Sequence, residues 1–85
     1  YELAQNYPNP FRTRTTVIFE TLEDTHVRLE VRDTRGRLAA VLTDAPYQHG
    51  RYQRVFDATG LASGVYNLVM TTPNFTATRT MLVTH

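Results

Sequence analysis

The chain has 85 residues, a formal net charge of +1 and no cysteine. This length predicts one domain with a single thin core, because such a chain buries only somewhat more than about 60% of its unfolded surface. The absence of cysteine excludes a disulfide framework or a thiolate metal site. All nine basic residues are arginine and nearly balance eight acidic ones, which gives no electrostatic basis for binding nucleic acid, and no apolar run is long enough to span a membrane.

The first predicted element is a proline-rich segment, QNYPNPFR at residues 5–12. Proline has no backbone N–H and moves the preceding residue out of the α region, so this segment cannot be a central strand. It could be an edge strand, a polyproline-like lead or a turn. We expect residues 1–14 to form an extended lead that fixes one aromatic residue on the core; the alternative is a stiff peptide epitope for a partner. Because the chain begins with Tyr1 and no signal-like segment, we expect it to be a piece of a longer protein.

The rest of the chain, residues 15–85, is predicted to form a β-sandwich. Val27, Leu29 and Val31 alternate with charged residues, as in a half-buried strand. Short runs rich in Val, Thr, Tyr and Phe, mostly separated by turn-forming residues, give six predicted strands: 15–22, 26–33, 37–43, 51–57, 64–71 and 75–84. The spacing favours an all-β fold, an antiparallel sandwich of immunoglobulin or fibronectin type with about seven strands, as a single domain over residues 1–85.

Four connections are predicted between these strands. DTRG at 33–36 can form a tight hairpin with Gly36 at positive φ, and TTPNF at 71–75 has Pro and Asn at its centre. DAPYQHG at 44–50 is expected to be a longer crossing. In ATGLASG at 58–64, Leu61 is expected to close one end of the sandwich.

The residue types that carry catalysis or bind metals do not converge in this sequence. His26, His49 and His85 share no metal-ligand spacing. GLASG at 60–64 lacks the order of a nucleophile elbow, and no calcium loop is present. We therefore expect neither an enzyme nor a cofactor.

Arginine residues gather around one predicted strand. Arg28 and Arg32 flank Glu30 on one face, which predicts a solvated and partly self-paired surface. With Arg35 and Arg37 at the adjoining turn, these side chains could instead contact a polyanion, since guanidinium groups fit phosphate well.

Several motifs in sequence order resemble one known family. These are LAQNYPNPF at 3–11, VRDTRGR at 31–37, FDA at 56–58, LASGVY at 61–66 and RTMLV at 79–83. Together they closely resemble the type A C-terminal sorting domains of the type IX (Por) secretion system, which are related to an Ig-like module of flagellar hook-capping proteins. The resemblance implies a domain that directs an exported cargo across the outer membrane. It also implies that the domain crosses the periplasm and is recognised by the outer-membrane translocon. The resemblance further implies that a sortase-like protease then cleaves the domain from the cargo, and that the cargo is released or attached to anionic lipopolysaccharide at the cell surface.

The same resemblance assigns candidate positions for recognition by the translocon. They are Pro8, Asn9, Pro10, Phe11, Gly64, Tyr66, Arg79, Met81 and Val83. The chain departs from the family pattern at several places. Arg12 and Thr13 follow the proline motif, Arg54 stands where an apolar residue is common and could shift the strand register, and His85 replaces a frequent terminal lysine.

The sequence is also compatible with two rival functions. A carbohydrate-binding or adhesive β-sandwich of a secreted hydrolase could stack sugar rings on Tyr47 and Tyr52, although the chain has no tryptophan. A hook-capping-like assembly module would share the fold.

Overall fold

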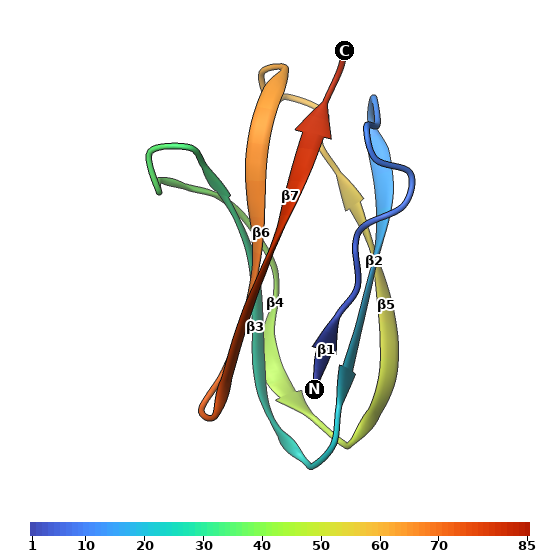
Figure 1. Ribbon diagram of the computed structural model, residues 1–85, viewed down its shortest axis with the longest axis vertical. Coiled ribbons are helices and arrows are strands. Elements are labelled where there is room, and N and C mark those ends of the chain that lie inside the picture. The colour runs from blue at the N-terminus through green and yellow to red at the C-terminus, as the bar shows by residue number, and fades with distance from the viewer.

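The computed structural model describes residues 1–85 as seven strands without a helix, packed in two layers (Figure 1). The strands are β1 (Glu2–Leu3), β2 (Arg14–Thr21), β3 (Thr25–Asp33), β4 (Leu38–Tyr47), β5 (Gly50–Asp57), β6 (Gly64–Thr72) and β7 (Phe75–Val83). One sheet has the order β1-β2-β5 and the other the order β4-β3-β6-β7, with antiparallel neighbours throughout. The predicted antiparallel β-sandwich is confirmed. No helix that could cross a membrane is present.

Alternation along β2, β3 and β6 builds the core between the two sheets. Each of these strands buries every second residue, because successive side chains in a strand point to opposite faces. The predicted inward set Val27, Leu29 and Val31 is fully buried. From the opposite sheet, Val17 and Phe19 meet them, and both are also fully buried.

The two tight turns predicted from sequence are confirmed. At the β3–β4 turn the Gly36 amide donates to the Asp33 carbonyl at 3.0 Å, and Gly36 has a φ of 83°, which a residue with a Cβ rarely adopts. The Asp33 carboxylate accepts the amides of Arg35 and Arg37, each at 2.9 Å. The β6–β7 turn leaves only residues 73 and 74 unpaired.

The predicted long crossing at residues 44–50 is wrong. β4 continues to Tyr47, which pairs with Thr25 of β3, so only residues 48 and 49 connect β4 to β5 in the opposite sheet. Pro46 lies within this strand, although proline normally interrupts a sheet. It is tolerated here because β4 is an edge strand, whose outer side pairs with no neighbour.

Residues 1–14 form the border of the sandwich rather than one extended lead. β1 pairs with β2, Tyr7 forms an isolated bridge with Thr16, and Phe11 forms a parallel bridge with Val83 of the other sheet. Between the two bridges, residues 8–10 form bends, and both X–Pro peptide bonds are cis. The segment therefore crosses from one sheet to the other.

Arg54 does not shift the register of β5, contrary to expectation. β2 and β5 pair without interruption from Arg14↔Asp57 to Thr21↔Gly50. Because β5 is an edge strand, the inward-facing Arg54 side chain extends to the open side of the sandwich, where it donates to the Tyr47 hydroxyl at 2.9 Å.

Candidate recognition surface

The motifs that the sequence analysis singled out meet near one end of the sandwich. The Phe11 amide donates to the Leu82 carbonyl at 3.0 Å, and the Thr84 amide donates to the Phe11 carbonyl at 2.8 Å. Gly64, at the start of β6, pairs with Val83 of β7. The proline-rich segment, the start of β6 and the end of β7 therefore lie together at the end where the chain reaches its C-terminal residue (Figure 1).

Asn9 fixes the bend of residues 8–10 on the outer edge of β7. Its side-chain oxygen accepts the Leu82 amide at 2.9 Å, and its side-chain nitrogen donates to the Thr80 carbonyl at 3.2 Å. Gln5 donates to the same carbonyl at 2.8 Å. Two amide side chains thus satisfy backbone groups that a neighbouring strand would otherwise pair.

Asn6 holds the bend from its inner side, and the sequence analysis missed it. This residue is 2% exposed and donates to the Thr15 hydroxyl at 3.0 Å and the Pro8 carbonyl at 3.3 Å. Thr15 also donates to the Pro8 carbonyl, at 2.8 Å. A polar residue two positions before a proline was the available signal, because asparagine often bonds the backbone two residues on.

Tyr66 anchors the connection between β5 and β6. The ring is buried, and its hydroxyl donates to the Ala62 carbonyl at 2.7 Å. A tyrosine near the start of this strand, bonded back to the upstream backbone, is the tyrosine corner of immunoglobulin-like sandwiches. Gly64 just before it has a φ of 150°, which favours glycine. The Gly-x-Tyr motif therefore has a structural role in the folded domain.

Arg79 connects the two sheets at the side where β7 is the edge strand. Its Nε donates to the Leu3 carbonyl of β1 at 2.8 Å. Inward-facing charged residues on edge strands oppose edge-to-edge pairing with another chain. Arg79 on β7 and Arg54 on β5 occupy corresponding places on the two sides of the sandwich.

The nine candidate positions divide by exposure. Four of them have buried side chains that pack in the core: Phe11, Tyr66, Met81 and Val83. The other five are exposed or half-buried: Pro8, Asn9, Pro10, Gly64 and Arg79. Only the second group is available for contact with a partner while the domain stays folded.

A comparison with known protein families matches residues 5–84 to the secretion system C-terminal sorting domain. The chain belongs to this family. Comparisons with curated proteins and with solved structures found no match. The sorting domain is a C-terminal signal for type IX secretion: it interacts with the type IX machinery and directs export to the cell surface or the extracellular space. Sorting domains of this family are not catalytic.

The arginine-rich face of the sorting domain is largely paired with its own carboxylates. Glu30 is buried and accepts Arg32 Nε at 2.6 Å and Arg28 Nε at 2.7 Å. Hydrogen bonds from Arg32 and Arg28 lower the pKa of Glu30, because they stabilise its charged form. Arg37 bonds Asp33 at 2.8 Å.

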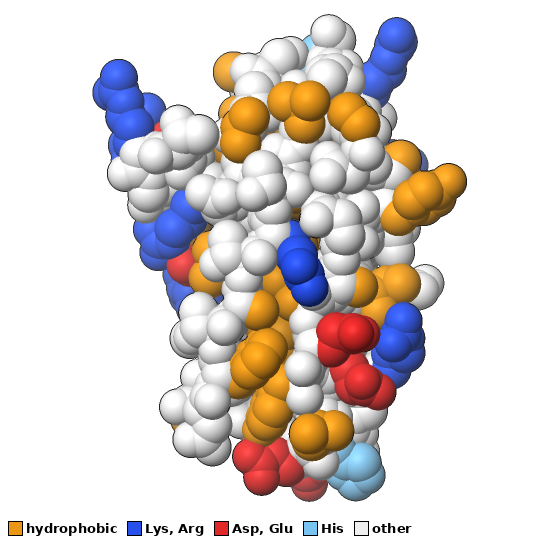
Figure 2. Space-filling model, in the orientation of Figure 1, with side chains coloured by type: hydrophobic (Ala, Val, Ile, Leu, Met, Phe, Trp, Pro, Cys, Tyr) orange, Lys and Arg blue, Asp and Glu red, His pale blue; other side chains and the backbone are white.

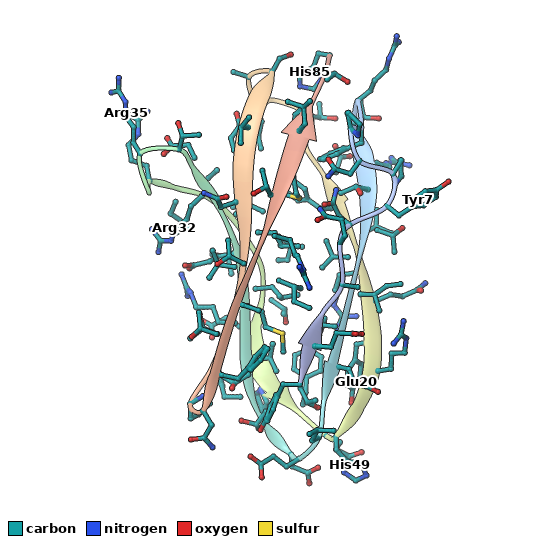
Figure 3. All side chains as sticks on the ribbon, in the orientation of Figure 1. Tyr7, Glu20, Arg32, Arg35, His49 and His85 are labelled. Atoms are coloured by element: carbon teal, nitrogen blue, oxygen red, sulfur yellow. The ribbon has the colours of Figure 1, made fainter.

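Arg35 is the member of this group without a carboxylate partner. Basic side chains gather along the side of β3 and the β3–β4 turn (Figure 2), and Arg35 projects from that turn into solvent (Figure 3). The self-paired surface predicted for Arg28 and Arg32 is present, so the polyanion contact remains a prediction with Arg35 as its most accessible member.

The tyrosines considered for sugar stacking pack between the sheets of the sorting domain. The Tyr47 and Tyr52 rings meet edge to face with centroids 4.8 Å apart, and both contact Phe19. They form no flat exposed platform, which gives the carbohydrate-binding alternative no support from the site.

The histidines and acidic residues of the sorting domain form no metal centre. No group of three or more His, Cys, Asp or Glu side chains is placed to hold a metal ion. His26 contacts Asp44, His49 contacts Asp24, and the His85 ring lies against the Leu61 carbonyl.

Proposed function

We propose that the type IX translocon recognises this sorting domain as a folded unit, through the bend of residues 8–10 and the adjoining end of β7. The cargo that the domain accompanies through the periplasm is then cut from it by a sortase-like protease and attached to the cell surface through anionic lipopolysaccharide. Pro8, Asn9, Pro10, Gly64 and Arg79 are the accessible candidates for the contact.

The bonding of Asn9 to β7 carries this proposal. Pro8 and Pro10 are exposed, yet the residue between them is bonded to two backbone groups of β7. A partner that reads this surface meets a shape already fixed before binding, so it loses little conformational entropy on association. Folding of the chain is what creates the surface, because its two parts come from opposite ends of the sequence.

Cleavage is expected outside the residues that the sandwich holds. The Tyr1 ring stacks on Phe75 with centroids 5.3 Å apart, and β1 pairs with β2 directly afterwards. A protease needs an extended and accessible segment, which favours a bond on the cargo side of Tyr1. Mass spectrometry of the domain released during export would identify the cut.

Export of a fluorescent reporter tests the proposal. The reporter carries an N-terminal signal peptide and this 85-residue chain at its C-terminus, and it is produced in a type IX-competent bacterium and in the same strain without the translocon. Recognition through the bend predicts export of the unmodified fusion in the competent strain only. The double variant Pro8→Ala/Pro10→Ala is expected to lose export while its thermal unfolding midpoint shows that the domain remains folded.

The chain offers a matched control in its other two prolines. Pro46 and Pro73 are also exposed, but they lie in β4 and in the β6–β7 turn, toward the opposite end of the sandwich (Figure 1). Pro46→Ala/Pro73→Ala should leave export intact. Equal loss of export in both double variants, or normal export of a folded Pro8→Ala/Pro10→Ala variant, would disprove recognition at the bend.

A further inference from the structure

The outer face of the three-stranded sheet has an uncharged centre that exposes apolar side chains. Tyr7 bridges Thr16, which pairs with Val55 of β5, so these three residues form one row across the sheet. The Tyr7 side chain is 80% exposed and Val55 is 63% exposed. Ile18 lies one row further along β2 and is half-buried. Figure 3 shows Tyr7 pointing away from the sandwich on the side of this sheet.

Charged residues border this centre at both ends of the strands. At one end, Arg14 lies 3.6 Å from Asp57 on the neighbouring strand. At the other end, Glu20 pairs in register with Arg51, which also lies 3.6 Å from Glu2. All of these side chains are exposed or half-buried. Figure 2 shows acidic and basic side chains next to each other low on this side of the molecule, with hydrophobic ones above them.

The charges along β2 and β5 are arranged so that this face is complementary to the same face of a second copy. The outward residues of β2 are Arg14, Thr16, Ile18 and Glu20, so the strand runs from positive through uncharged to negative. The outward residues of β5 follow the reverse order in space, with Asp57 beside Arg14 and Arg51 beside Glu20. When a second copy of this face is turned end for end and laid over the first, each charge lies opposite a charge of the other sign.

We propose that the outer face of the three-stranded sheet binds the same face of a second copy of this chain, about a two-fold axis that runs across the strands. In this arrangement β2 lies antiparallel over its counterpart, and Arg14 of one copy faces Glu20 of the other. On β5, Asp57 faces Arg51 in the same way. The row of Tyr7 and Val55 then packs against the row of Ile18 and Gln53, with charged groups around a largely uncharged centre.

Charge opposes the arrangement in which β2 lies parallel over its own counterpart. A two-fold axis parallel to the strands and centred on β2 would place Arg14 opposite Arg14 and Glu20 opposite Glu20, and like charges across an interface oppose association. The antiparallel arrangement has no such repulsive contact. It has four attractive ones, because the pairs Arg14–Glu20 and Asp57–Arg51 each occur twice across the two-fold axis. When β2 lies over its counterpart, the charges thus favour the antiparallel orientation, while the uncharged centre supplies the area that is removed from water.

The size of the face makes this association weak and dependent on concentration. Three strands about 4.8 Å apart and eight residues of about 3.3 Å each give roughly 400 Å² per copy, well below the roughly 800 Å² per partner of a stable complex. We therefore expect association that is detectable only at high protein concentration. Such pairing forms where copies are crowded, and it uses a surface other than the contact proposed for the translocon.

Sedimentation velocity of the 85-residue chain from about 10 μM to about 1 mM tests the self-association. The weight-average sedimentation coefficient should rise with concentration, and high salt should suppress the rise because exposed ion pairs are screened. Arg14→Glu and Glu20→Arg should each weaken association by at least about threefold, and the double variant, which exchanges the two charges, should restore it. Arg35→Glu on the other sheet is the control that should change nothing.

The exchange of charges distinguishes pairing of the two faces from general electrostatic attraction. Circular dichroism confirms that each variant is folded before sedimentation is compared. A chain that stays monomeric at every concentration, or a double variant no better than the single ones, would overturn the proposal. If the chain is monomeric and Tyr7→Ser abolishes reporter export, the translocon binds this face and a second copy does not. This result would also refute the proposed pairing.

Discussion

The side-chain oxygen of Asn9 lies 2.9 Å from the backbone nitrogen of Leu82, although the two residues are 73 positions apart. This bond and the Asn9 bond to Thr80 attach the proline-rich bend to β7. Asn9→Ala removes both, so the free energy of unfolding should fall by about 1 to 2 kcal/mol. Denaturant unfolding measures the loss, and hydrogen exchange should show faster exchange of the Leu82 amide in particular. Gln53→Ala, an exposed amide whose side chain bonds nothing, is the control.

The Tyr66 hydroxyl is predicted to stabilise the domain through its bond to Ala62. Tyr66→Phe keeps the ring in place and removes one hydrogen bond, which should lower the free energy of unfolding by about 1 kcal/mol. Tyr7→Phe is the matched control, because the Tyr7 side chain is exposed and its hydroxyl has no partner in the structure. Equal effects of the two substitutions would show that the corner bond contributes nothing.

Phe11 is predicted to contribute more to stability than any exposed residue of its motif. The ring is 3% exposed and meets the Phe56 ring edge to face at 6.3 Å. Phe11→Ala leaves a cavity and should cost about 3 to 5 kcal/mol, whereas Phe11→Leu refills most of the space and should cost less. Thermal unfolding of both variants measures the difference. A loss of export by a folded Phe11→Leu variant would instead show that the partner reads the ring itself.

The stability of the domain should depend on pH through Glu30. Its pKa is lowered in the folded state, so its contribution is present above the ordinary glutamate pKa of about 4.3 and disappears as pH falls through the lowered value. Glu30→Gln should therefore be less stable than the wild type at pH 7, and this gap should close at acidic pH. Urea unfolding across the pH range measures it.

Glu20→Gln is the control for the pH experiment. The Glu20 carboxylate accepts no hydrogen bond, so this variant should follow the wild type closely. A gap between Glu30→Gln and the wild type that stayed constant from neutral to acidic pH would contradict the role assigned to the Glu30 carboxylate.

Local features of the fold were predictable from sequence. The alternation at Val27, Leu29 and Val31 and the turn at Gly36 depend on neighbouring residues alone, so pattern and turn chemistry sufficed to place them. The end of β4 was not predictable in this way. Pro46 argues against a strand unless the strand lies at the edge of its sheet, and edge position is a property of the whole fold.

The candidate site was predictable only in part, because its contacts join distant parts of the chain. Nothing near Asn9 or Arg79 in the sequence indicates that the first bonds β7 and the second bonds β1. The resemblance marked Tyr66 for recognition, whereas the structure gives it an internal bond. A tyrosine two residues after glycine, at the start of a late strand in a predicted sandwich, was the available signal for that role.

The parallel bridge between Phe11 and Val83 is placed where tension along the domain would load it in shear. The first residue and the last lie toward opposite ends of the sandwich (Figure 1), and the segment ending at Phe11 runs alongside the end of β7. Tension between the two ends therefore slides these segments past each other, so that the hydrogen bonds, which run across the strands, carry the load together instead of breaking one at a time. A domain pulled lengthwise is therefore expected to resist until these hydrogen bonds break together.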